Sequence, residues 1–176
     1  MGLEVVKSST PKLIREKLKS SVSLILNGTE EDIQNFVEGV KTEFKSMSVN
    51  EIAFPRGVKN LNKYRDKQGS DIYVKGTPIH VKGALIFNSL LQKKRLNKIP
   101  PIQDGDKIRF AYLKEPNPIH ESVIACLDEL PKEFGLDKYI DHEKQFDKAF
   151  LEPLKSITEV IDWQTEKISS LEEFFA

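Results

Sequence analysis

Positive charge is concentrated in one segment of this 176-residue chain. Residues 52–98 contain eleven Lys and Arg side chains but only two acids, Asp66 and Asp71. Residues 119–176 contain fourteen Asp and Glu against six Lys, so the formal net charge of zero hides two oppositely charged regions. A segment this basic is suited to neutralising the phosphates of a polyanion, with salt-sensitive affinity and little base readout. The acidic region is expected to face away from that polyanion or to bind another partner.

Six side chains of the basic segment are candidates for phosphate contacts: Lys59, Lys63, Arg65, Lys67, Lys75 and Lys82. Asn62 and Tyr64 lie among them in the sequence and could reach sugars or minor-groove edges, where a sequence-blind protein can contact any base pair. The alternative interpretation is a solvated loop and helix face, because lysine-rich surfaces are common.

The sequence offers no pattern typical of a catalytic or metal site. The three histidines are scattered and lack metal-ligand spacing: His80, His120 and His142. Asp104 and Asp106 flank Gly105, which is typical of a turn. Cys126 lies in an apolar run and is expected to be a buried, inert thiol. We therefore predict no catalytic residue and no metal ligand in this chain.

The C-terminal tail, residues 169–176, is the second candidate site. Leu171 lies three positions before the adjacent Phe174 and Phe175. A short turn with this spacing presents three apolar side chains on one side, which suits a hydrophobic pocket on another protein. The alternative is a tail that folds back onto its own domain.

The composition favours a single domain from a reducing compartment. A hydrophobic content of 39% is enough for one core. No stretch approaches the roughly 20 apolar residues of a membrane span. The first seven residues lack the basic start and apolar run of a signal peptide. We therefore predict a cytoplasmic protein that does not bind membranes.

The hydrophobic pattern predicts an α+β fold, mostly helical with short antiparallel strands. The first helix is expected at 11–27, with Thr10 as its N-cap, Pro11 as its first residue and Gly28 as a left-handed stop. The second helix is capped by Thr29. A third is expected at 78–96. A long helix from about residue 141 should be kinked or divided by Pro153.

Short strands are expected at 3–6, at 50–54 and at 107–114, with 123–127 as the partner of the third strand. Residues 56–70 have little periodicity and are predicted to be a polar loop. The basic segment therefore combines this loop with the third helix, and the acidic region contains the last helix.

Several stretches resemble the B-family DNA polymerases of the T-even-type bacteriophage replicative kind. The sequence Gly-Leu-Glu-Val-Val-Lys-Ser-Ser-Thr-Pro-Lys at 2–12 resembles their palm-to-thumb junction. The resemblance continues in order through 62–64, 78–88, 150–154 and 170–175. It implies the thumb, the subdomain that grips newly made duplex behind the active site.

This resemblance implies a palm-junction strand at 1–10, a thumb domain at 11–168 and a clamp-binding-like tail at 169–176. Within the thumb, 52–98 is the DNA-facing segment and 141–162 the acidic helix. The residues implied to contact the primer-strand backbone are Lys7, Ser8, Ser9 and Thr10. Those implied to line the duplex channel are Asn62, Lys63, Tyr64, His80 and Lys82. The anchors implied to dock on a sliding clamp are Leu171, Phe174 and Phe175.

Two features depart from that family. The carboxylates that hold two metal ions on the palm are absent, so Mg²⁺ is implied for the complete polymerase and no cofactor for this chain. Ile168 also stands where the broader clamp-binding pattern has Gln. Met1 is then either an internal methionine of a longer polymerase or the start of the small product of a split polymerase gene.

The function implied is the DNA-binding part of a phage-encoded, DNA-directed DNA polymerase in the bacterial cytoplasm. Its implied partners are primer–template duplex, the polymerase palm or catalytic fragment, and a sliding clamp. The alternative is a non-catalytic replisome or clamp adaptor that does not bind DNA directly.

Overall fold

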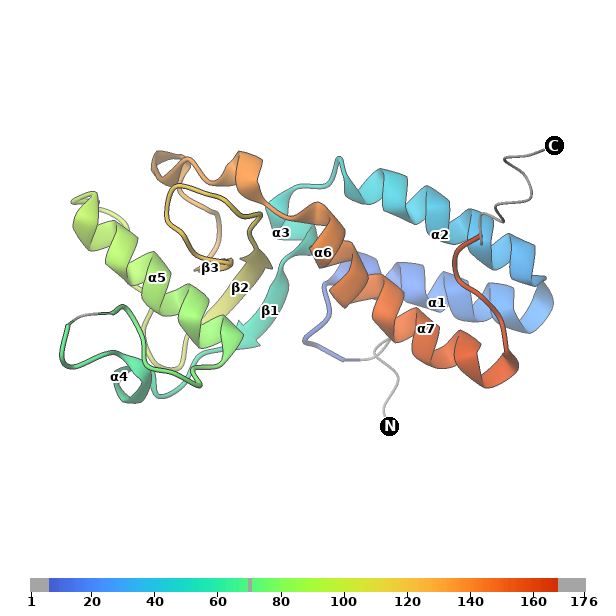
Figure 1. Ribbon diagram of the computed structural model, residues 1–176, viewed down its shortest axis with the longest axis horizontal. Coiled ribbons are helices and arrows are strands. Elements are labelled where there is room, and N and C mark those ends of the chain that lie inside the picture. Colours follow the sequence, from blue (N-terminus) through green and yellow to red (C-terminus); the bar gives the residue numbers. More distant parts are fainter. Residues whose placement is uncertain (1–6, 70, 168–176) are drawn as a thin grey trace.

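The computed structural model describes residues 7–69 and 71–167 of the chain. Figure 1 shows two lobes that lie end to end. The helical lobe contains α1, α2 and the C-terminal helices, and the sheet lobe contains three strands with α4 and α5. One hydrophobic core runs through both lobes. The predicted α+β fold is confirmed.

Helices α1 (Lys12–Asn27) and α2 (Glu30–Phe44) form an antiparallel pair (Figure 1). Thr29 caps α2 as predicted. The Thr29 hydroxyl accepts a hydrogen bond from the Asp32 N–H at 3.3 Å, and the Asp32 carboxylate accepts one from the Thr29 N–H at 2.8 Å. This reciprocal capping box satisfies donors that a helix start otherwise leaves unpaired.

Two details of α1 differ from the prediction. Pro11, rather than Thr10, occupies the N-cap position, because its ψ of 143° is extended. Gly28 is also extended, with φ −117°, rather than left-handed. A Cβ at Gly28 would lie 2.9 Å from the Leu24 carbonyl oxygen and 3.0 Å from Asp32 Oδ2. Glycine is therefore required there by the close approach of α1 to the start of α2, and not by a positive φ.

The C-terminal helix is divided, as predicted. Its parts are α6 (His142–Phe146), the π-helical turn η4 (Asp147–Leu151), α7 (Glu152–Thr158) and the 3₁₀ turn η5 (Glu159–Ile161). The wide η4 turn lies directly before Pro153, which has no N–H for a regular helix interior. Phe146, Phe150 and Leu154 are buried, whereas Ile161 is 41% exposed.

The strands form an antiparallel sheet in the order β1-β2-β3. Their bounds are β1 (Phe54–Gly57), β2 (Lys107–Tyr112) and β3 (Val123–Cys126). The predicted pairing of β2 with β3 is confirmed.

The strand predicted at 50–54 is wrong. Helix α3 (Val49–Ile52) occupies most of that range, and β1 begins only at Phe54. Ser48 and Glu51 form a second capping box at the start of α3, with the Ser48 N–H donating to Glu51 Oε2 at 2.8 Å. This local start signal places residues 49–52 in a helix.

Helix α5 (Ile79–Lys93) packs along β3, and it ends three residues before the predicted limit. The other helices of the described residues are short: α4 (Leu61–Tyr64), η2 (Lys132–Phe134) and η3 (Asp137–Tyr139). None of the helices within 7–69 and 71–167 has the length and apolarity needed to cross a membrane.

Replacing Gly83 of α5 with alanine is expected to destabilise the fold by about 1–3 kcal/mol. The added methyl group would lie 3.0 Å from the Ala125 backbone nitrogen and 3.1 Å from its Cβ, so α5 would have to move away from β3. Urea unfolding followed by circular dichroism measures the change.

The control is Gly39→Ala on the exposed face of α2, where a Cβ meets no atom within 4 Å. This variant is expected to gain about 0.5–1 kcal/mol, because glycine weakens a helix interior relative to alanine. Equal stability of the two variants would contradict tight packing of α5 on β3.

Gln145 joins the two lobes. This fully buried side chain of α6 accepts a hydrogen bond from the Tyr112 N–H at 3.1 Å. Its amide nitrogen donates to the Ile52 carbonyl oxygen at 2.8 Å. One side chain therefore satisfies backbone groups of both β2 and α3 inside the core.

Candidate nucleic-acid interface

A groove of about 630 Å³ lies where the lobes meet. Five segments line it: the residues before α1, β1, the start of α5, β2 and the η4–α7 region. Figure 1 shows β1 in the middle of the molecule, between α5 of the sheet lobe and the C-terminal helices. Three residues implied by the resemblance meet in this groove, namely Ser9, Thr10 and His80.

Aromatic rings lie on one side of the groove. Phe54 of β1 stacks on Phe110 of β2 with ring centres 5.2 Å apart, and Tyr112 lies edge-on to Phe110 at 6.1 Å. The His80 ring lies 6.3 Å from Phe110. Phe54 and Tyr112 are half-buried, so the groove combines an apolar surface with polar side chains.

Burial lowers the pKa of His80, and the neighbouring Arg56 guanidinium lowers it further. The imidazole is therefore neutral at pH 7. Within the groove, His80 supplies a ring with one donor and one acceptor, while Arg56 supplies positive charge.

Sequence reasoning did not select Arg56 or Lys148 as binding residues, although both line the groove. Lys148 belongs to the acidic region, and its Nζ lies 2.5 Å from Glu152 Oε1. The negative charge of Glu152 is therefore balanced inside the groove. An alternating strand pattern at 54–57 would have pointed to Arg56, but no sequence signal places Lys148 near β1.

Residues 58–77, which we name the basic arm, connect β1 to α5. The sequence predicted a loop for most of this range, but the structure has α4 and an antiparallel bridge between Arg65 and Tyr73. The Asp66 carboxylate accepts backbone hydrogen bonds from Gln68 and Asp71, each at 3.0 Å. The arm exposes five cations: Lys59, Lys63, Arg65, Lys67 and Lys75.

Tyr73 anchors the basic arm to the sheet lobe. Its hydroxyl donates to Glu121 Oε2 at 2.7 Å, and burial followed by this interaction raises the pKa of Tyr73 to about 12. Tyr73 thus remains a protonated donor at neutral pH. Lys82 Nζ of α5 lies 4.8 Å from the centre of the Tyr73 ring, within the range of a cation–π interaction.

The positive charge of residues 52–98 is not paired within the fold. Among the residues that the structure describes, none of the eleven Lys and Arg side chains of this segment has an acidic partner within 4.0 Å. The ion pairs found there involve other residues: Lys17–Glu43, Lys41–Glu166, Lys148–Glu152 and Lys155–Glu166. The segment's charge is thus available to an external anion.

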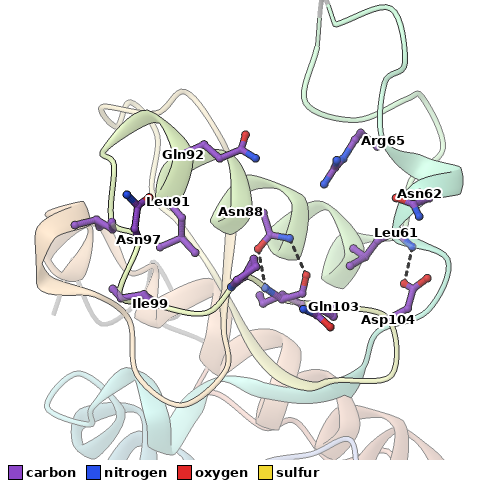
Figure 2. A pocket seen from close by; sticks show the side chains of 13 residues that line it. Leu61, Asn62, Arg65, Asn88, Leu91, Gln92, Asn97, Ile99, Gln103 and Asp104 are labelled. Carbon is purple, nitrogen blue, oxygen red and sulfur yellow. Dashed lines mark hydrogen bonds between the residues drawn. The ribbon is translucent and has the colours of Figure 1, made fainter.

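Not all of the predicted residues converge. Asn62 and Arg65 line a separate cavity beside α5, shown in Figure 2. Thr10 is only 3% exposed, whereas Lys7 and Ser8 lie on the surface. The predicted strand at 3–6 and the anchors Leu171, Phe174 and Phe175 lie outside the described residues. Within 7–69 and 71–167, no cluster of three His, Cys, Asp or Glu side chains could hold a metal ion.

No model of a known protein family matches the chain. It is similar to the DNA-directed DNA polymerase of Enterobacteria phage T4, with 32% identity over 179 residues. It is also similar to the DNA-directed DNA polymerase of Escherichia phage RB69, with 30% identity over 180 residues. Each match covers 99% of this chain but only 19% of the polymerase. The resemblance to T-even-type phage DNA polymerases is therefore confirmed, for a region that makes up 19% of each of those enzymes.

Proposed function

We propose that this chain is the thumb part of a DNA-directed DNA polymerase and grips primer–template duplex without sequence preference. The observation that carries the proposal is the unpaired charge: eleven cations of residues 52–98 lack an acidic partner among the described residues. Similarity to two phage DNA polymerases supports DNA as the polyanion.

The basic arm and the groove have different tasks in this proposal. The exposed lysines of the arm neutralise phosphates, which gives affinity that does not depend on sequence. The groove places Arg56 and neutral His80 beside an aromatic surface, which suits sugars and minor-groove edges. Tyr73 and Lys82 hold the arm on the sheet lobe, so binding does not require a long loop to become ordered.

The remaining partners follow from the same proposal. The catalytic carboxylates and their Mg²⁺ ions belong to a palm outside this chain, and the chain completes that enzyme as a binding module. Leu171, Phe174 and Phe175 tether it to a sliding clamp through three apolar anchors. The C-terminal helix brings one acid to the groove, Glu152, whose charge Lys148 balances, and its other acids face away from the DNA, because like charges repel.

Fluorescence anisotropy of the purified chain with a labelled primer–template duplex, repeated across a salt series, tests the proposal. Affinity is expected to fall steeply with salt, by a slope of about 0.9 for each phosphate contacted. Duplexes of unrelated sequence are expected to bind equally. Absence of binding at low salt, or a shallow slope, would contradict DNA gripping by the isolated chain.

The second candidate function is a replisome adaptor that does not contact DNA. It is favoured by two apolar side chains of the helical lobe, Leu26 and Val160, which are 75% and 82% exposed and suit a protein partner. Lys63→Glu and Lys82→Glu distinguish the two functions. The thumb proposal expects weaker duplex binding, and the adaptor no change. Lys132→Glu in η2 is the control, because it makes the same charge change outside the basic segment.

A further inference from the structure

The cavity in Figure 2 is a candidate binding site separate from the groove. It encloses about 520 Å³ between α4, the second half of α5 and residues 96–104. A volume of this size is typical of small-ligand sites and holds one nucleotide, but not a base pair of a duplex. Figure 2 shows Arg65 reaching from the end of α4 toward α5, with Gln92 and Asn97 on the other side.

The framework of the cavity is built from satisfied polar groups. The buried Asn88 amide donates to the Ile102 carbonyl oxygen and accepts from the Ile102 N–H, both at 2.8 Å. Asp104 Oδ1 accepts the Leu61 N–H at 2.8 Å, so the acid of the lining is bonded to the backbone. These bonds join α5 and α4 to residues 102–104 and preform the cavity.

Five other polar side chains of the lining have hydrogen-bonding capacity to spare. None of them makes a side-chain hydrogen bond or ion pair to the residues that the structure describes: Asn62, Arg65, Gln92, Asn97 and Gln103. Each amide offers both donors and an acceptor, and the guanidinium offers a planar fork of donors. Leu61, Leu91 and Leu96 provide apolar surface between them.

The surroundings of the cavity are positive. Lys63 and Lys67 lie in the arm on one side, and three cations follow the end of α5 on the other: Lys94, Arg95 and Lys98. The occupant is therefore anionic, with a planar part that has hydrogen-bonding edges and apolar faces. A nucleotide has all of these properties. Its base edges are free only when the nucleotide is unpaired.

We propose that this cavity binds one unpaired nucleotide of a single-stranded DNA. Arg65 pairs with its phosphate, the amides of Gln92 and Asn97 bond to the base edge, and the leucines cover the base faces. Single-strand binding proteins commonly combine a basic path for the backbone with pockets for bases. The site does not depend on the proposed duplex groove, because the two share no lining residue.

Fluorescence anisotropy with two labelled single-stranded probes tests the site. Each probe is about eight nucleotides long, which is within the usual site size of single-strand binding proteins. One probe is oligo(dT), and the other is an abasic strand with the same phosphates. The full chain is expected to bind oligo(dT) about tenfold more tightly, because a base contact contributes about 1–3 kcal/mol. Equal affinity for the two probes, or no binding of either, would overturn the proposal.

The double variant Gln92→Ala/Asn97→Ala is expected to lose the preference for oligo(dT) while keeping its affinity for the abasic strand. Both side chains are exposed, so the fold does not depend on them. The control Asn35→Ala/Gln164→Ala removes two exposed amides of the helical lobe and is expected to keep the preference. A preference that survives in the cavity variant would also overturn the proposal. If duplex binding fails but the preference for oligo(dT) is seen, only the thumb proposal is contradicted.

Discussion

Neutralising four lysines of the basic arm is expected to weaken duplex binding between about 100-fold and 1,000-fold at 0.15 M salt. The substitutions to glutamine are at Lys59, Lys63, Lys67 and Lys75. All four side chains are exposed and have no acidic partner within 4.0 Å among the described residues, so their charges are available to neutralise phosphates. The slope of log affinity against log salt should fall by up to about 3.6, which is 0.9 for each lost phosphate contact.

The matched control changes the net charge by the same amount elsewhere. It replaces four exposed lysines outside the arm with glutamine: Lys19, Lys45, Lys132 and Lys167. If binding depends on where the charge lies, this variant keeps most of its affinity and its slope. If both variants weaken binding equally, only total charge matters, and the assignment of the basic arm fails. Anisotropy over the same salt series measures both.

Gln145→Met is expected to lower the free energy of unfolding by about 2–5 kcal/mol, the largest stability effect of a single substitution that we predict. Methionine has a similar volume but cannot replace either hydrogen bond. The Tyr112 N–H and the Ile52 carbonyl would lose partners that now lie at 3.1 and 2.8 Å. Both groups lie where the lobes join, so DNA binding should fall together with stability.

Urea unfolding monitored by circular dichroism and by tryptophan fluorescence measures this effect. Gln34→Met is the control, because Gln34 makes one exposed hydrogen bond of 3.3 Å to the Gln164 carbonyl and its loss is expected to cost less than about 0.5 kcal/mol. A loss for Gln145→Met as small as that of the control would show that water or a local shift satisfies the two backbone groups.

Local signals were sufficient to predict several elements of the fold. Thr29 was identified as a cap because a helix start needs acceptors for its first N–H groups, and Pro153 as a break because it lacks an N–H. The error at 50–54 also has a local cause. The apolar part of this range, residues 52–54, is too short to distinguish a strand from a helix, and the Ser48–Glu51 capping box decides for the helix.

The candidate site was less predictable, because its parts meet only through long-range packing. The basic segment was visible as composition, but its division between groove and cavity was not. His80 lines the groove together with Arg56 of β1 and Lys148 of η4, whereas Arg65 lines the separate cavity beside α5. No spacing in the sequence encodes those neighbours. The sequence also did not predict that the basic arm is ordered, because its ordering depends on the hydrogen bond from Tyr73 to Glu121, 48 positions away.

The origin of the groove in five separate segments affects how the chain forms and loses this proposed binding site. Residues as far apart as Ser9, Arg56, His80 and Lys148 must all be in place before the groove exists. Contacts between distant parts of a chain form late in folding, since their loop-closure entropy is large, whereas the α1–α2 pair is local and can form early. The groove is thus a late product of folding. Opening of any one lining segment abolishes it, so the competent population can fall while most of the helices are still intact.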